Sequence, residues 1–138
     1  MNDLNLILVR GLPGSGKSSL ARFLADGTWM RHLETDMYWI NTITGEYEFV
    51  PERIKDAHIW CQKGVDHILN LGYSVVVSNT FTQKWELQPY FEIAKKYGII
   101  PQVILAQNQF KNIHNVPEEV LVKMKDRFEY DISELFED

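Results

Sequence analysis

Glycines, a lysine and serines stand between residues 11 and 19 at the spacing of a phosphate-binding loop, which is a glycine, four further residues, then Gly16-Lys17-Ser18. Such glycines let successive backbone N–H groups turn toward one anion at the start of a helix. The lysine reaches the β- and γ-phosphates of a nucleotide, and the serine hydroxyl binds Mg²⁺. An ordinary glycine turn that caps a helix is the alternative interpretation.

This loop predicts ATP and Mg²⁺ as cofactors. Ser18 is the expected metal ligand, and Lys17 is expected to bind the nucleotide and to take part in catalysis. The residues expected to contact the nucleotide are Gly11, Pro13, Gly14, Ser15, Gly16, Lys17, Ser18 and Ser19.

A strand and a helix must flank the loop for it to work as a site. Residues 4–9 form a nearly continuous apolar run, which is typical of a strand covered on both faces. After the loop, Leu20, Phe23 and Leu24 stand at helical spacing. The sequence therefore predicts a strand, the glycine loop and a helix in that order.

Further strands and helices alternate along the chain. Short apolar runs predict strands at 30–34, 73–77 and 99–106, the last at an edge or starting at Pro101, while 41–49 forms a hairpin or an irregular flap. Helices are expected from Pro51 to Gly72, from Thr82 to Tyr97 with a kink or restart at Pro89, and from Val116 onward.

This alternation requires a parallel sheet with right-handed crossovers. The predicted fold class is α/β, a single P-loop NTPase domain over residues 1–138. It has a small parallel sheet of about four strands flanked by helices and is of the nucleoside-kinase-like type, which the resemblance described below extends to polynucleotide-kinase-like.

Composition limits the partners that we expect. The net charge of −5 gives no bulk attraction to nucleic acid, so a strand end or a small molecule is the expected acceptor rather than a long duplex. Cys61 is the single cysteine, and its place on an amphipathic helix predicts buried packing. We recognise no signal peptide and no apolar span of about 20 residues, so we expect a soluble, cytoplasmic protein without a membrane partner.

Six short motifs in this order resemble the polynucleotide 5′-kinase branch of P-loop kinases. Together they extend over nearly the whole chain, and the set is more specific than the phosphate loop alone. The motifs are Arg10 to Ser18, Thr35-Asp36-x-Tyr38, Ala57-His58-x-Trp60, Ser78-Asn79-Thr80, Trp85 to Tyr90 and Asn112 to Pro117.

The resemblance implies roles for individual residues. Asp36 corresponds to the general base that takes the proton of an acceptor hydroxyl, although an aspartate here also suits a turn or a helix cap. Lys111 stands where the family carries a lid arginine, and a solvated surface lysine is the alternative. His114 is expected to pack at the base of the lid rather than touch ATP. Asn79 and Thr80, at the end of a strand, are expected to contact the substrate.

Two positions depart from the family. The family carries a carboxylate at position 78 or 79, whereas this chain has Ser78 and Asn79. An acceptor-binding arginine of the phage kinase is replaced by Trp39, which either stacks on a substrate base or packs in the core. Trp60 and Trp85 are expected to pack because both lie in amphipathic helices.

Three functions remain open from the sequence. The first is an ATP-dependent phosphotransferase acting on the 5′-hydroxyl of a nucleic-acid end. The second is a kinase of small molecules, which the acidic charge would suit. The third is a nucleotide-binding regulator that transfers little phosphate and acts through protein partners.

Overall fold

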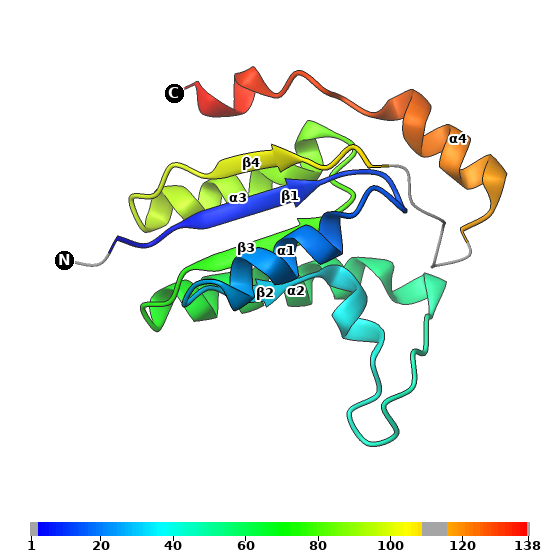
Figure 1. The fold of residues 1–138 in the computed structure, drawn as a ribbon, viewed down its shortest axis with the longest axis horizontal. Coiled ribbons are helices and arrows are strands. Elements are labelled where there is room, and N and C mark those ends of the chain that lie inside the picture. Colours follow the sequence, from blue (N-terminus) through cyan, green and yellow to red (C-terminus); the bar gives the residue numbers. More distant parts are fainter. Residues whose placement is uncertain (1–2, 109–115, 138) are drawn as a thin grey trace.

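Four parallel strands form the centre of the molecule (Figure 1). The computed structural model describes residues 3–108 and 116–137. The strands are β1 (Leu6–Arg10), β2 (Arg31–Leu33), β3 (Val75–Asn79) and β4 (Gln102–Leu105), in the spatial order β2-β3-β1-β4. The parallel sheet of about four strands is confirmed, and β4 lies at an edge as Pro101 indicated.

Helices cover both faces of this sheet, and strand alternation decides which residues meet which helix. On one face Ile7, Val9 and Val76 pack with Ala21 of α1 (Lys17–Asp26). On the other face Leu6, Leu8, Val75 and Val77 pack with α2 (Ile54–Asn70) and α3 (Lys84–Lys96). Cys61 lies in this second core, as predicted.

The remaining elements are short. Two 3₁₀ turns, η1 (Thr35–Trp39) and η2 (Pro51–Arg53), flank a segment at 40–50 that carries an antiparallel bridge between Ile40 and Tyr47. This segment, called the flap below, extends away from the sheet (Figure 1). The chain ends in α4 (Glu118–Arg127) and η3 (Ser133–Phe136), and the Phe136 ring packs against Phe91 at 5.0 Å between centroids.

The packing expected for Trp85 was wrong, and of the two alternatives at Pro89 the restart of the helix does not occur. Helix α3 runs through Pro89 without a restart, since it is continuous from Lys84 to Lys96. The side chain of Trp85 is 69% exposed, and that of Phe23 is 75% exposed despite its helical spacing. Their indole and phenyl rings lie on turns of helix that no other described element covers, a tertiary feature that periodicity does not reveal.

No helix within residues 3–108 and 116–137 has the length and apolar character needed to cross a membrane.

Candidate nucleotide-binding and phosphotransfer site

The phosphate loop curls at the carboxyl end of β1 and leads directly into α1. Gly14 and Gly16 have φ angles of 83° and 88°, in the left-handed region that side chains other than glycine rarely adopt, and Gly16 caps the helix. A Cβ atom at Gly11 would lie 2.8 Å from the carbonyl oxygen of Ala106 and would collide with the Ser15 side chain. The first N–H groups of α1 have no partner within the helix, so the loop ends in an anion-binding position.

Hydrogen bonds from both sides hold the loop in place. The Gly11 N–H donates to the Thr80 carbonyl oxygen at 3.2 Å, and the Asn108 N–H donates to the Ser15 carbonyl oxygen at 3.1 Å. Thr80 therefore supports the loop through its backbone. Ser19, by contrast, lies exposed on the first turn of α1, where Arg22 donates to its hydroxyl at 3.4 Å.

Lys17 is the first residue of α1 and faces two carboxylates. Burial lowers the pKa of the Lys17 ammonium, while the negative charges of Asp36 and Glu34 act in the opposite direction. The structure thus places the loop lysine and Asp36 within electrostatic reach of each other. A bound phosphate would add further negative charge beside this ammonium group.

Asp36 lies in η1, directly beyond β2, and its backbone is fixed from β3. The Thr35 N–H donates to Oδ1 of Asn79 at 2.8 Å, so the amide of Asn79 holds the turn that carries Asp36. Asn79 is 8% exposed, and its Nδ2 points toward the Cys61 thiol of α2. Asn79 makes this positioning contact because odd-numbered β3 residues face α2 and α3. Its expected contact with the substrate stays a prediction.

Glu34 is the residue of the site that sequence reasoning missed. Its Oε2 accepts hydrogen bonds from Ser18 Oγ at 2.7 Å and from Ser78 Oγ at 2.9 Å. The side chain of Glu34 is 17% exposed, and His32 Nε2 lies 3.8 Å from the same oxygen. Its place follows from the strand register and not from a signal in the sequence: Leu33 pairs with Val77, so the next residues along, Glu34 and Ser78, lie side by side.

Two further expectations concern aromatic and lid residues. Trp39 is 5% exposed and packs edge-on against Tyr38 and Phe49, which supports the packing alternative. Lys111 and His114 lie outside the described residues, and their roles stay predictions.

Arg10 follows the apolar run of β1 and was not assigned a role by the sequence. Its guanidinium is buried at 2% exposure and donates from Nε and Nη2 to the Phe81 carbonyl oxygen at 3.0 and 2.7 Å. The ring of Phe128 lies 4.4 Å from the Arg10 Cζ atom, and burial lowers the pKa of Arg10. Arg10 thus joins the end of β1 to the turn after β3 and to the residue that follows α4.

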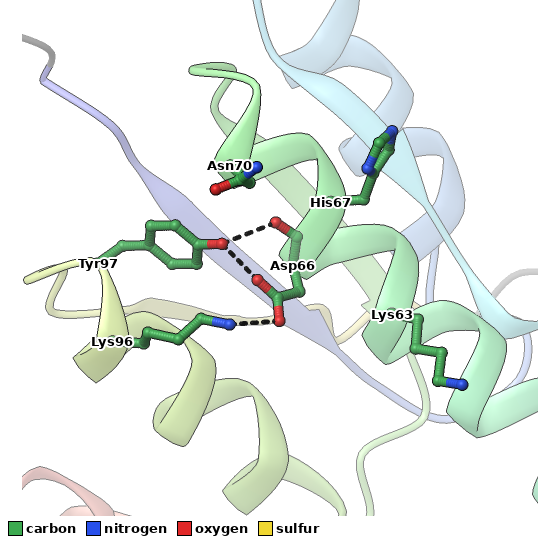
Figure 2. Close-up of a pocket in the computed structure, with 6 residues that line it drawn as sticks. All are labelled: Lys63, Asp66, His67, Asn70, Lys96 and Tyr97. Atoms are coloured by element: carbon green, nitrogen blue, oxygen red, sulfur yellow. Dashed lines mark hydrogen bonds and ion pairs between the residues drawn. The ribbon is translucent and has the colours of Figure 1, made fainter.

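A polar hollow between α2 and α3 lies away from this site (Figure 2). Lys96 Nζ contacts Oδ2 of Asp66 at 2.6 Å, and the Tyr97 hydroxyl donates to the Asp66 carbonyl oxygen at 3.1 Å. These residues stand at the carboxyl ends of α2 and α3, shortly before β3 and β4 begin. The hollow therefore lies near the amino-terminal ends of the strands, whereas the phosphate loop lies at their carboxyl ends. Its contacts tie the two helices together.

The chemistry of the donors suits Mg²⁺ bound with a nucleotide. Within the described ranges, no three His, Cys, Asp or Glu side chains gather to hold a metal by themselves. Mg²⁺ in nucleotide sites takes one or two protein oxygens, substrate phosphates and water. The Ser18 hydroxyl and the neighbouring Glu34 carboxylate are oxygen donors of this kind.

The phosphate loop, the parallel sheet and the flanking helices define a P-loop kinase-like domain. Residues 6–130 match the protein family described as AAA domain, and the chain belongs to that family. The resemblance to P-loop kinases is therefore confirmed.

Known proteins show the same fold around different activities. The chain is 34% identical over 141 residues to NEDD4-binding protein 2 of Homo sapiens, covering 94% of this chain but only 8% of that protein. A structure of the Pnkp1/Rnl/Hen1 RNA repair complex aligns at a TM-score of 0.59 and 22% identity, covering 92% of this chain and 38% of that chain. A gluconokinase from Sinorhizobium meliloti aligns at a TM-score of 0.62 and 19% identity, covering 94% and 77%. The two structural likenesses establish the fold.

Proposed function

We propose that this domain is an ATP-dependent, Mg²⁺-dependent phosphotransferase whose acceptor is the 5′-hydroxyl of a nucleic-acid end. The observation that carries the proposal is the meeting of Lys17, Ser18 and Asp36 beyond the carboxyl ends of β1 and β2, the two strands that flank β3. Ligands of parallel α/β sheets bind at the carboxyl ends of the strands, and this edge holds the loop and the carboxylate together.

The proposed reaction assigns one task to each side chain. The acceptor oxygen forms a bond to the γ-phosphorus, the bond from that phosphorus to the β–γ bridging oxygen breaks, and ADP leaves. Asp36 takes the proton of the acceptor hydroxyl. Lys17 and the N–H groups of the loop bind the phosphate oxygens. Mg²⁺, when bound at Ser18, supplies charge neutralisation on the phosphates.

The flap contacts Asp36 through the Tyr47 hydroxyl at 3.3 Å, and we place the acceptor on this side of Asp36. Tyr47 and Phe49 are 51% and 49% exposed, and such rings provide faces on which a base can stack. Glu46 and Glu48 are also exposed on the flap, and their charges oppose a long polyanion. These features support an acceptor with one base and few phosphates next to the reacting hydroxyl, such as the end of a strand.

A kinase of small molecules is the second candidate function. The observation that favours it is the acidic flap beside Asp36, together with a net charge of −5, because neither attracts a polynucleotide. The gluconokinase of similar fold acts on a small molecule, as its name states, and illustrates that the architecture serves such acceptors.

The deciding experiment is transfer of label from γ-labelled ATP. The purified protein is incubated with Mg²⁺, labelled ATP and a panel of 5′-hydroxyl oligonucleotides, 3′-hydroxyl controls bearing a 5′-phosphate, nucleosides and sugars. Label on the 5′-hydroxyl oligonucleotides alone supports the first proposal, and label on a nucleoside or sugar supports the second. Lys17→Ala protein is the control for contaminating kinases. Binding of ATP without label on any acceptor contradicts both.

A further inference from the structure

The carboxylate beside the loop serine is that of Glu34, directly after β2, whereas the family resemblance implies a carboxylate at position 78 or 79 of β3. At position 78 this chain has a serine, and the Ser78 hydroxyl donates to Glu34 Oε2 at 2.9 Å. Because Leu33 of β2 pairs with Val77 of β3, Glu34 and Ser78 follow in register on neighbouring strands. His32 and Glu34 alternate with Leu33, so both point to the sheet face that α1 covers.

Building on the proposed phosphotransferase, we propose that Glu34 provides the carboxylate of the Mg²⁺–nucleotide site, by holding the Ser18 hydroxyl in the orientation that binds the metal. Glu34, directly after β2, thus supplies the negative charge that Ser78 and Asn79 of β3 do not carry. Glu34 is a positioning residue in this scheme, since it acts through Ser18.

The hydrogen-bond chemistry of a hydroxyl supports this role. Ser18 has one proton to donate and two lone pairs to offer. Its proton goes to Glu34 Oε2 at 2.7 Å, so the lone pairs are left for a cation. A neutral partner would hold this proton less firmly, because hydrogen bonds to a charged acceptor are about twice as strong as neutral ones.

The surroundings of Glu34 keep its carboxylate in this position. Ser78 is 1% exposed and donates to the same oxygen as Ser18, so a fixed β3 side chain braces Glu34 from the sheet side. His32 Nε2 lies 2.7 Å from Ser78 Oγ and extends the chain of contacts along β2. Burial lowers the pKa of the Lys17 ammonium, and the Glu34 carboxylate, together with Asp36, opposes this by favouring the protonated form.

A purely structural role is the alternative, and charge distinguishes the two. The amide oxygen of a glutamine can accept the same two hydrogen bonds, so Glu34→Gln retains the packing and removes the negative charge. Loss of a group that orients a metal ligand typically lowers metal affinity about 10- to 100-fold. Without metal, however, removing a negative charge near the phosphates should leave ATP binding unchanged or tighter.

The test measures the dissociation constant of ATP by calorimetry, in Mg²⁺ and in EDTA, for each protein. We expect the tightening of ATP binding by Mg²⁺ to fall about tenfold or more in Glu34→Gln, with no weakening in EDTA. Glu92→Gln, an equal charge change at an exposed position of α3, should keep the wild-type ratio. Ser78→Ala, which removes a neutral partner of Glu34, should keep most of it.

Further results test the role of the Glu34 charge. Glu34→Asp keeps the charge and should retain a larger Mg²⁺ effect than Glu34→Gln. An unchanged Mg²⁺ effect in Glu34→Gln, or an equal loss in Ser78→Ala, overturns the role of the Glu34 charge and leaves the proposed function intact. Wild-type protein that binds no ATP in either condition overturns the proposed function and this inference together.

Discussion

The hydroxyl of Tyr47 donates a hydrogen bond to Oδ1 of Asp36 at 3.3 Å and so joins the flap to the proposed general base. Burial and the neighbouring Asp36 carboxylate raise the pKa of Tyr47 to about 12, so the phenol remains a donor throughout the physiological range. The same flap is closed by two backbone bonds, from Asn41 N–H to the Glu46 carbonyl oxygen and from Glu48 N–H to the Trp39 carbonyl oxygen. Asp36 is therefore coupled to the position of the flap.

Tyr47→Phe removes this link and keeps the ring. This bond has a charged acceptor but is long and exposed, so we expect the contribution of an ordinary hydrogen bond, about 0.5–1.5 kcal/mol. The amides of Asn41 and Glu48 should then exchange with deuterium about 2- to 10-fold faster. ATP affinity should stay the same, because the hydroxyl is on the acceptor side. Tyr130→Phe is the control, since it changes an exposed tyrosine far along the chain. Equal exchange in Tyr47→Phe and wild type would show that the bond does not hold the flap.

Lys17 and Asp36 should separate nucleotide binding from transfer. Lys17 contacts phosphates before and during the reaction, so Lys17→Ala should weaken ATP binding and abolish transfer. Asp36 acts on the acceptor proton alone, so Asp36→Asn should leave ATP affinity nearly unchanged and reduce turnover about 10²- to 10⁴-fold. Equilibrium binding and single-turnover transfer measure the two effects. An Asp36→Asn protein as active as wild type would remove the proposed base.

Variants of Lys111 test whether a lysine can replace the lid arginine of the family in phosphate transfer. If Lys111 replaces that arginine, Lys111→Ala should lower turnover, and Lys111→Arg should preserve or raise it, because a planar guanidinium spans two phosphate oxygens. The measurement is transfer at saturating ATP, with Lys123→Ala as a control on the exposed side of α4. No change in either Lys111 variant would assign this residue to the solvated surface.

The sequence was sufficient to predict the sheet and the loop, because both depend on local patterns. Apolar runs marked the strands, and the glycine spacing marked the turn at which Gly14 and Gly16 adopt positive φ angles. Glu34 was not predicted as a site residue because its contacts with Ser18 and Ser78 depend on the pairing between strands. Nothing in the run from Met30 to Glu34 says which neighbour Glu34 will have; the register with β3 does.

Side-chain burial was predicted less well than the elements. Helical spacing gave the same weight to Leu20 and Phe23, yet Leu20 packs in the core and Phe23 is exposed. Spacing defines a face of a helix, but only the tertiary arrangement decides how wide a stripe of that face is covered. Arg10 shows the reverse case, a charged residue that the fold buries because carbonyl oxygens of the turn after β3 satisfy its donors.

Arg10 should be important for stability. Arg10→Lys keeps the charge but cannot make the paired bonds from Nε and Nη2 to the Phe81 carbonyl oxygen. A buried, imperfectly satisfied ammonium should lower the free energy of unfolding by about 2–4 kcal/mol. Urea unfolding measures this change, and Arg53→Lys, at an exposed arginine, should cost less than about 1 kcal/mol. Equal stability of the two variants would contradict the structural role of Arg10.

His58 should make the fold sensitive to acid. Burial in α2 lowers the pKa of the His58 imidazole below its ordinary value of 6.5, and the opposing charge of Glu86 offsets this only in part. The folded state therefore favours the neutral ring. Its contribution to stability is present above pH 6.5 and is lost as the pH falls through the lowered pKa of the folded state, because the unfolded chain takes up the proton first.

Urea unfolding of wild type and His58→Gln at pH 7.5 and pH 5 isolates this contribution. The free energy of unfolding of wild type should fall more between the two pH values than that of His58→Gln, since the variant has no ring to protonate. His67→Gln provides the matched control, because His67 is on the same helix but exposed, and it should retain the wild-type dependence. If His58→Gln loses as much stability in acid as wild type, then the acid sensitivity arises from other groups, and the neutral His58 contributes nothing to it.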